Sequence, residues 1–297
     1  MEVKTGVPPE AVNQAATHTL FVEGSGPDAI DPRALKRLLQ DTGISVKALG
    51  PSFHVKSAAQ ALHPHHPNYY FVVDRDHYDE SAVDNAWTNF PDPGTHNLLI
   101  WRKRELENYF LDPDYLSRSP FLTRCKAADF KTRLLKLSAE RIFFDMANQT
   151  IERIRELQKV KWIEDFTNPA KFTTAAEAVG QLKGSTSLSS RAATVGEQLK
   201  FQAVEKIFGE LHDDFLAGTT KPAYGKGHWL DRMRGKPILS ALISQCFEVK
   251  DSDGNVLTGK EAVTLVAEEL LQQGISLQPS DFRDLHGLIV ARVPAKP

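Results

Sequence analysis

The sequence predicts an α/β protein in which a mostly parallel sheet carries helices on both faces and is followed by a mainly helical part. Two patterns support this class. Up to about residue 118, short apolar runs alternate with segments of helical period, which is typical of βαβ units. Right-handed crossovers then place the connecting helices on both faces of the sheet. From about residue 120, the apolar residues follow the helical period alone.

Four apolar runs are the expected strands. They lie at residues 19–22, 44–48, 69–73 and 97–101. The third run, YYFVV, is apolar throughout, as is typical of a strand buried on both faces of a parallel sheet. In doubly wound sheets the first and third strands are neighbours, and we expect the same arrangement here.

Helices are expected between these strands. Three leucines within residues 35–39 form one apolar helix face, and Asp31 is the expected N-cap of this helix because a proline follows it. Further helices are expected at 53–62 and around 105–110.

The second half of the chain is expected to be mainly helical, with one break. Apolar residues recur at helical spacing around 130–137, 204–215 and 263–270. The Ser/Thr-rich segment 184–194 is expected to be a loop. The predicted organisation is therefore an irregular arm at 1–16, a first domain at 17–118 and a mainly helical domain at 119–297.

Composition excludes several classes of protein. Lys plus Arg number 36 and Asp plus Glu 38, for a net charge of −2, which excludes a uniformly basic nucleic-acid coat protein. No apolar run is long enough to span a membrane. The first residues contain no apolar signal core, so the expected location is the cytoplasm. Cys125 and Cys246 form no CxxC pair and are expected to be reduced thiols.

Acidic residues follow two of the expected strands. Glu23 ends the first strand, and Asp74 and Asp76 end the third. In an extended segment, residues i and i+2 point to the same side, so three carboxylates converge if the two strands are neighbours. Clustered carboxylates repel one another unless a cation neutralises them, and Mg²⁺ or Mn²⁺ prefers such oxygen ligands. The alternative is that these acids are ordinary polar residues at strand ends.

Three motifs together resemble a known family. They are VEG at 22–24, VDRD at 73–76 and WRKRELENY at 101–109. This constellation resembles the Toprim domain, the metal-binding module of topoisomerases, primases and OLD-family nucleases. The ENY segment is similar to that of stand-alone Toprim-like nuclease effectors of bacterial antiphage systems, the PARIS system above all. The resemblance covers roughly residues 17–115 and implies a Toprim-like, Rossmannoid sheet.

The resemblance implies roles for individual residues. Glu23 would be a metal ligand or general acid/base, Asp74 and Asp76 would be metal ligands, and Glu107 would be a further catalytic acid. Glu105 and Glu107 lie two positions apart, so on a helix they would not face one site together, and the family pattern favours Glu107.

The resemblance also implies a function and partners. The chain would be a Mg²⁺-dependent endonuclease, a toxic antiphage effector that cleaves RNA, specifically tRNA. An ABC-type ATPase partner would control it, and a homodimer stays open. The sequence by itself does not distinguish RNA from DNA.

Basic residues supply candidate nucleic-acid contacts. The segment 221–236 holds five Lys or Arg against one acid, with three aromatic rings interleaved, a combination that suits single-stranded nucleic acid. An exposed basic loop or solvated surface is the alternative in each case. The candidate phosphate-binding residues are Arg75, Arg102, Arg104, Lys226, Arg232, Arg234 and Lys236.

Two further function classes stay open. Residues 24–29 (GSGPDA) fit the dinucleotide fingerprint of a nucleotide-binding Rossmann enzyme. Against it, Glu23 and Asp28 place negative charge where a pyrophosphate would lie, and the helix is expected to begin too late, at Asp31. The other class is a non-catalytic, partner-binding subunit with a degenerate Toprim fold.

Overall fold

The computed structural model describes residues 18–293 except 27–28, 64, 77, 92–96, 160–167 and 172. The predicted arm at 1–16 lies outside the described residues. The chain divides into two compact units. We call Met1–Glu140 with Trp229–Pro297 the sheet unit, and Arg141–His228 the insert unit.

The sheet unit is built on four parallel strands. They are β1 (Thr19–Val22), β2 (Ser45–Ala48), β3 (Tyr69–Val73) and β4 (Leu98–Ile100). Their order in the sheet is β2-β1-β3-β4, and each neighbouring pair is parallel. The predicted α/β class, the strand positions and the pairing of the first strand with the third are confirmed.

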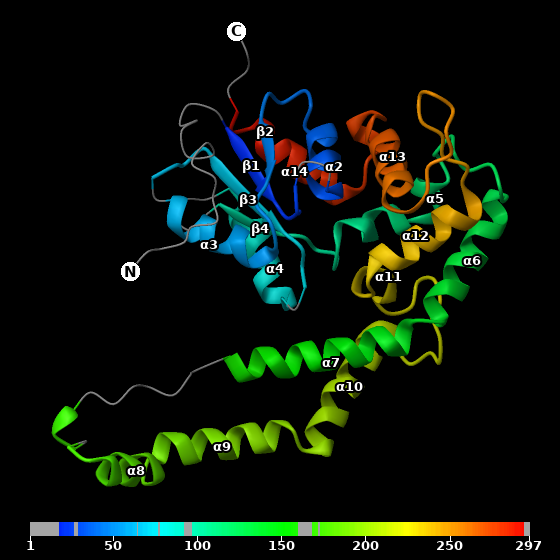
Figure 1. The fold of residues 1–297 in the computed structure, drawn as a ribbon. Helices are drawn as coiled ribbons and strands as arrows, with labels where there is room; N and C mark the ends of the chain where they lie inside the picture. The colour runs from blue at the N-terminus through cyan, green and yellow to red at the C-terminus, as the bar shows by residue number, and fades with distance from the viewer. Residues whose placement is uncertain are drawn as a thin grey trace. The chain divides into compact units, whose positions relative to one another are not determined.

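Three helices connect the strands. They are α2 (Ile30–Leu38), α3 (Ser52–Leu62) and α4 (Glu80–Asn89). Figure 1 shows α2 and α3 on opposite sides of the sheet, as right-handed crossovers require. The N-cap of α2 is Ala29 and not Asp31, which lies inside the first helical turn and is buried. The prediction for Asp31 was therefore wrong, because the helix begins earlier than its proline indicates.

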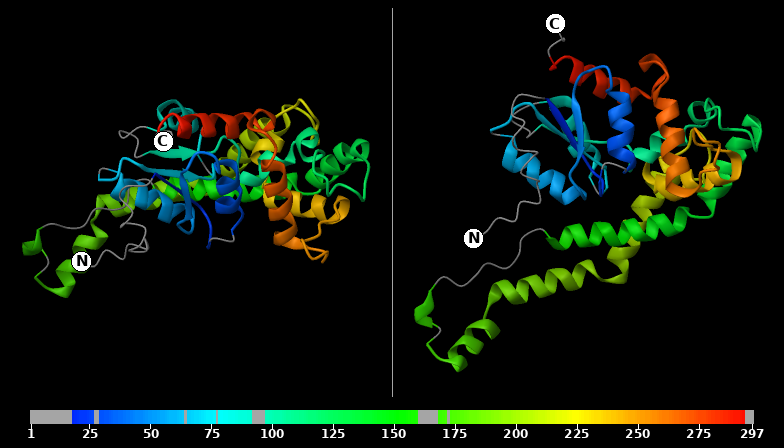
Figure 2. Two further views of the ribbon diagram at one scale, coloured as in Figure 1. Left: turned by 90° about the horizontal axis from the view of Figure 1, so that it is seen from above. Right: turned by 45° about the horizontal axis from the view of Figure 1, so that its top comes forward.

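The remaining elements of the sheet unit pack back on this core. They are η2 (Leu106–Leu111), α5 (Pro113–Leu116), α6 (Ala127–Ala139), α11 (Trp229–Arg232), α12 (Gly235–Cys246), α13 (Gly259–Leu271), η4 (Ile275–Leu277) and α14 (Ser280–Val290). Helix α12 contacts η2, and α13 lies beside α2 (Figures 1 and 2). The unit thus extends past the boundary expected at residue 118, because these late helices complete the packing around the sheet.

The insert unit is helical. It contains α7 (Ile142–Lys159), η3 (Pro169–Lys171), α8 (Ala175–Lys183), α9 (Thr186–Gln198) and α10 (Phe201–Leu216). Helices α7 and α10 pack together, whereas α8 and α9 bury none of their residues. The prediction of a loop at 184–194 was wrong, because most of this segment belongs to α9. Ser185 is the N-cap of α9, and its side chain accepts a hydrogen bond from the Leu188 N–H, as is common for serine at this position.

Neither unit contains a helix, among the residues described, that is long and apolar enough to cross a membrane. Both cysteines are free thiols, with Cys246 buried and Cys125 partly exposed.

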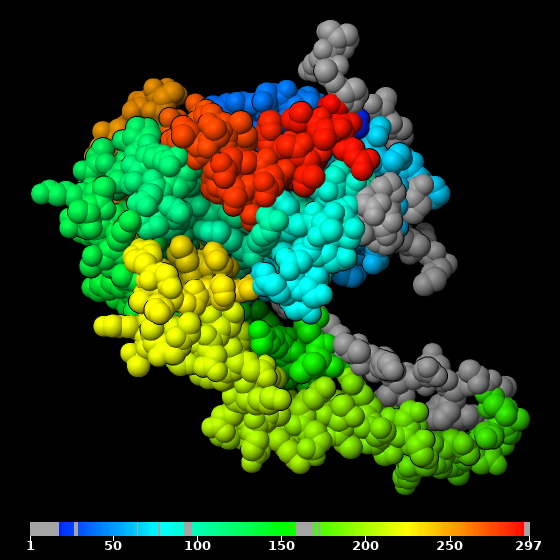
Figure 3. Space-filling view, turned by 180° about the vertical axis from the view of Figure 1, so that it is seen from behind, coloured from blue at the N-terminus to red at the C-terminus, as the bar shows by residue number. Residues whose placement is uncertain are grey.

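Aromatic rings join the sheet to the elements around it. Trp101, just after β4, is fully buried and contacts the rings of Trp87 on α4, Tyr109 on η2 and Phe282 on α14. Figure 3 shows α14, in red, directly against the cyan segment that contains α4. Trp101 therefore holds α4, η2 and α14 to the end of the sheet.

Replacing Trp101 by alanine is expected to destabilise the protein by about 3–5 kcal/mol, because the change leaves a cavity among three rings. Urea unfolding followed by circular dichroism measures this loss. Phe53→Ala is the control: Phe53 is 73% exposed, and its removal should change the free energy of unfolding by less than about 0.5 kcal/mol. A loss for Trp101→Ala no larger than the control would contradict the role of this ring.

Candidate functional site

Two of the predicted acids meet where β1 and β3 end. Glu23 follows β1, Asp74 follows β3, and Oε1 of Glu23 accepts a hydrogen bond from the Asp74 N–H at 2.9 Å. Gly24 turns the chain after Glu23 with φ +139° and exchanges two main-chain hydrogen bonds with Gly50 at 3.0 and 2.9 Å. A Cβ on Gly24 would lie 2.7 Å from the Cβ of Ala29, so the turn requires glycine here.

Asp74 links the sheet to two other elements. Its side chain is buried, and Oδ1 accepts a hydrogen bond from the Leu106 N–H at 3.2 Å. Its Oδ2 lies 3.8 Å from Nζ of Lys236, at the start of α12. The carboxylate thus fixes the ends of β3, η2 and α12 relative to one another.

The ENY segment brings two more carboxylates. Glu105 has extended backbone and caps η2 reciprocally with Asn108. Its Oε2 accepts a hydrogen bond from the Lys236 N–H at 2.9 Å, and its Oε1 lies 3.2 Å from Nε of Arg234. Glu107 is 3% exposed, and its Oε2 lies 3.9 Å from Nζ of Lys236.

The expectation that only one of these two glutamates faces the site was wrong. Glu105 precedes η2 and is not helical, so the rule that helical positions i and i+2 diverge does not apply. Both carboxylates lie around Lys236, and the charge of Glu105 raises the pKa of Glu107.

Asp31 is a site residue that the sequence analysis did not identify. It is buried, and burial raises its pKa to about 7; Lys236 opposes the rise, while Glu23 and Glu105 add to it. We call Glu23, Asp31, Asp74, Glu105 and Glu107 the carboxylate cluster. An Asp-Pro at a helix start is so common as a cap that no sequence signal marked Asp31.

Burial and mutual repulsion raise the pKa values of several carboxylates in the cluster. Burial raises the pKa of Glu107 to about 8 even though Lys236 lowers it. Burial also raises the pKa of Asp74, and the charges of Asp31 and Glu23 add to this. The pKa of Glu23 is raised by burial too, while the hydrogen bond from the Asp74 N–H opposes it. At neutral pH the carboxylates of the cluster therefore either remain partly protonated or are stabilised by a nearby cation.

Lys236 supplies positive charge to the cluster. Burial by itself lowers the pKa of its ammonium, but the carboxylates of Glu107 and Asp74 outweigh this and hold the pKa above its ordinary value. The side chain remains 47% exposed, so the ammonium reaches the cluster from the solvent side.

Asp76 stands apart from the cluster. It is exposed, and its φ of +44° is left-handed, so the extended geometry expected between Asp74 and Asp76 does not hold. Its charge nonetheless raises the pKa of Glu23. Asp76 thus acts on the site through its charge.

Several predicted phosphate-binding arginines form ion pairs within the sheet unit. Arg75 is buried and donates to Glu80 at 2.9 Å and to the Arg102 carbonyl at 2.9 Å. Arg232 donates to the same Glu80 at 2.7 Å. These hydrogen bonds lower the pKa of Glu80 to about 2. Both guanidinium groups therefore hold the loop before α4 in place.

The other predicted basic residues have varied settings. Arg102 pairs with Asp281 at 2.6 Å and stacks over the Trp87 ring. Arg104 is buried next to Glu105, and its N–H donates to the Asp231 carbonyl. Lys226 is exposed in the insert unit. Lys236 and Arg234, both among the predicted cations, contact the carboxylate cluster.

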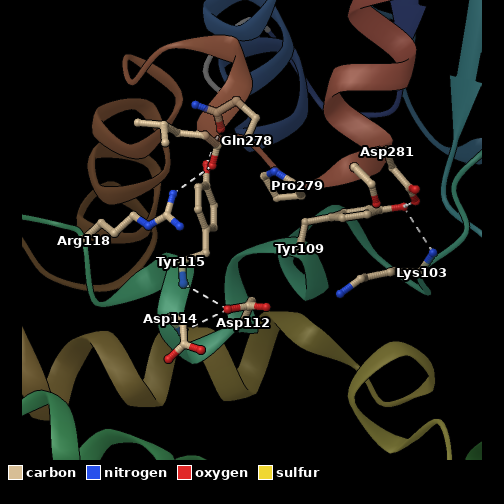
Figure 4. Close-up of a pocket in the computed structure, with 11 residues that line it drawn as sticks. Lys103, Tyr109, Asp112, Asp114, Tyr115, Arg118, Gln278, Pro279 and Asp281 are labelled. Atoms are coloured by element: carbon tan, nitrogen blue, oxygen red, sulfur yellow. Dashed lines mark hydrogen bonds between the residues drawn. The ribbon is translucent and has the colours of Figure 1, made fainter.

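A separate pocket of about 330 Å³ lies between η2, α5 and the start of α14 (Figure 4). Its two phenols are engaged within the protein: Tyr109 donates to Asp281 at 2.5 Å and Tyr115 to Gln278 at 2.5 Å. Arg118 donates to the Leu277 carbonyl. Because these lining groups satisfy one another, we assign no ligand to this pocket.

The carboxylate cluster has the donor chemistry of a divalent-metal site. Oε2 of Glu107 is buried and has no hydrogen-bond partner among the residues described. Within that same part of the chain, no three His, Cys, Asp or Glu side chains lie close enough to form a ready metal site. Hard oxygen donors and excess negative charge nevertheless fit Mg²⁺ or Mn²⁺.

No protein-family model, curated protein or solved structure matches this chain.

Glu107→Gln is expected to raise the melting temperature at pH 8 in EDTA. The folded-state pKa of about 8 exceeds the ordinary 4.5, so the folded protein loses stability as pH rises between these values. The amide removes this loss. By linkage the gain at pH 8 should be on the order of 4 kcal/mol, at least several degrees in melting temperature, and should vanish near pH 4.5.

Differential scanning fluorimetry from pH 4.5 to pH 8 measures this effect. Glu261→Gln, an exposed site on α13, is the control and should change the melting temperature little at any pH. A melting temperature for Glu107→Gln below that of the wild type at pH 8 would contradict a cluster with excess negative charge.

Proposed function

We propose that the chain is a metal-dependent nuclease of the Toprim type that hydrolyses phosphodiester bonds. The observation that carries this proposal is the convergence of Glu23, Asp74 and Glu107. They come from three separate motifs of the resemblance and lie in one cluster at the carboxyl ends of parallel strands. Ligand sites of open α/β sheets lie at such strand ends.

Glu23 and Asp74 would hold Mg²⁺ or Mn²⁺, with Glu107 close by, whereas Asp76 would act on the ion only through its charge. When bound, the ion would neutralise charge on the phosphate and lower the pKa of a water molecule. The raised pKa values of Glu23, Asp74 and Glu107 support a site that favours added positive charge.

The protein's own residues would contribute in two ways. The Lys236 ammonium, reached from solvent, is placed to contact a non-bridging phosphate oxygen and to stabilise the charge that develops there. Glu107, with a pKa of about 8, carries a proton through much of the neutral range and suits protonation of the leaving oxygen.

The substrate, the partner and the biological setting are proposed from the resemblance of the VEG, VDRD and ENY motifs to Toprim-like antiphage effectors. We propose RNA, specifically tRNA, as the substrate, an ABC-type ATPase as the controlling partner, and antiphage defence as the setting. The Rossmann alternative is weaker. Helix α2 begins at Ile30, earlier than expected, but Glu23 and the buried Asp31 still place acidic groups beside the glycine-rich turn.

A non-catalytic, partner-binding subunit is the second candidate. The observation that favours it is the pairing of the cluster with Lys236 and Arg234, which neutralises part of its charge without a metal. Under this alternative the carboxylates would only hold η2 and α12 to the sheet.

A cleavage assay separates the two candidates. Purified protein is incubated with tRNA, single-stranded RNA and duplex DNA, with either Mg²⁺ or EDTA. Cleavage should require Mg²⁺ and should fall by at least about 100-fold in Glu23→Gln and Asp74→Asn, whereas Glu261→Gln should retain full activity. Cleavage that persists in both cluster variants would overturn the site, and no cleavage of any substrate would favour the partner-binding subunit.

A further inference from the structure

A second cavity, of about 930 Å³, lies between α2, β2 and α13. Figures 1 and 2 show these three elements side by side at one edge of the sheet. Strand β2 is the edge strand of the sheet, and within the described ranges no further strand covers this side. The lining residues are Gly26, Pro32, Arg33, Lys36, Arg37, Gln40, Ile44, Val46, Lys47, Ala48, Leu265, Glu268 and Gln272. We call this cavity the basic groove.

One face of α2 supplies most of the positive charge of the groove. Arg33, Lys36 and Arg37 fall at positions i, i+3 and i+4 and therefore share this face. Lys47 adds a fourth cation from β2. Among the described lining residues Glu268 is the single acid, and Arg33 neutralises it with two hydrogen bonds of 2.7 and 2.6 Å. On a chain of net charge −2, this is a local concentration of positive charge.

Arg37 has donor capacity that the described part of the protein does not use. Its Nη1 donates to Oε1 of Gln40 at 3.0 Å, whereas its Nε is buried and has no hydrogen-bond partner among the described residues. Guanidinium groups present several N–H donors in a plane and match phosphate oxygens well. Arg37 therefore has the chemistry to bind an anion in the groove.

The groove lies next to the carboxylate cluster. Gly26, at one end of its lining, is three residues after Glu23. A Cβ placed on Gly24 would lie 3.3 Å from Cδ of Pro32 and 3.5 Å from Cβ of Ala48, and both of these residues line the groove. The turn that carries Glu23 is thus in contact with the groove wall.

We infer that the basic groove binds the sugar–phosphate backbone of a nucleic acid. Lys36, Arg37 and Lys47 would contact successive phosphates, and the apolar side chains of Ile44, Val46 and Leu265 would contact the sugars. None of the lining residues described is aromatic, so binding would follow the backbone and not the bases. This inference rests on the proposed function in one respect. The bound nucleic-acid strand would run from the groove towards the carboxylate cluster, where one of its phosphodiester bonds would be cleaved.

Fluorescence anisotropy in EDTA tests binding without cleavage. The probe is a 5′-labelled 20-nucleotide single-stranded RNA, titrated at several KCl concentrations. Lys36→Glu/Arg37→Glu is expected to weaken binding at least 10-fold and to reduce the slope of log K against log salt by about 2, one for each lost phosphate contact. The uncharged pair Lys36→Ala/Arg37→Ala should give a smaller loss in the same direction.

Lys126→Glu/Lys136→Glu is the matched control. Both residues are exposed, lie outside the groove lining, and give the same change of net charge. This pair should weaken binding less than 2-fold if the groove, and not the total charge, attracts the RNA. Circular dichroism checks that every variant retains the helical content of the wild type.

The outcomes separate the groove from the nuclease. Binding by the wild type that is lost in the groove variants supports the groove, whether or not the protein cleaves RNA. If the groove variants and the control variants bind RNA equally well, the groove proposal is wrong, but the proposed nuclease activity is unaffected. The same holds if the wild type cleaves RNA but binds it outside the groove. A wild type that binds no 20-mer at low salt also overturns the groove.

Discussion

The carboxylate cluster places more negative than positive charge in the interior of the sheet unit, and the structure around it depends on how this charge is balanced. The Lys236 ammonium lies 3.8 Å from Asp74 and 3.9 Å from Glu107, and Arg234 pairs with Glu105. Burial raises the pKa values of Glu23, Asp31, Asp74 and Glu107, and the charges of neighbouring carboxylates add to the rise. Keeping several carboxylates out of water costs free energy unless cations lie beside them, which is the position of Lys236 and Arg234.

Close approach between η2 and the start of α12 holds the cluster together. Asn108 donates to the carbonyls of Leu230 and Met233 at 2.8 and 2.9 Å and so fastens η2 to the segment before α12. Gly235 lies against Asn108 so closely that a Cβ would be 2.5 Å from its Oδ1. This close approach allows the N–H of Lys236 to reach Glu105, so small residues set the position of the charged one.

Local patterns were sufficient to predict the sheet. Apolar runs located β1 and β3, and the doubly wound order predicted that they pair, which placed Glu23 and Asp74 together before any contact was known. Asp31 was missed because its local context, a proline at the start of a helix, has a common structural explanation. Its burial depends on residues far along the chain, which a single sequence does not reveal.

The same reason accounts for the other errors. Glu105 was assigned to a helix because the ENY segment has helical spacing, although the capping interaction with Asn108 starts η2 one residue later. Arg102 and Arg232 pair with Asp281 and Glu80, which lie far away in the chain, and local patterns do not reveal such ion pairs. Helices α12 and α13 pack on η2 and α2 through long-range contacts, which local patterns do not reveal.

The insert unit separates the two halves of the sheet unit in the chain, and this has a consequence for synthesis. A ribosome completes Glu107 about 130 residues before Lys236, which at 5–20 residues per second is a delay of roughly 6–26 s. During that interval the nascent chain carries the carboxylates without their ammonium and without α12 to enclose them. The centre is therefore assembled only after the helical insert has left the ribosome, so an interrupted translation product would lack it.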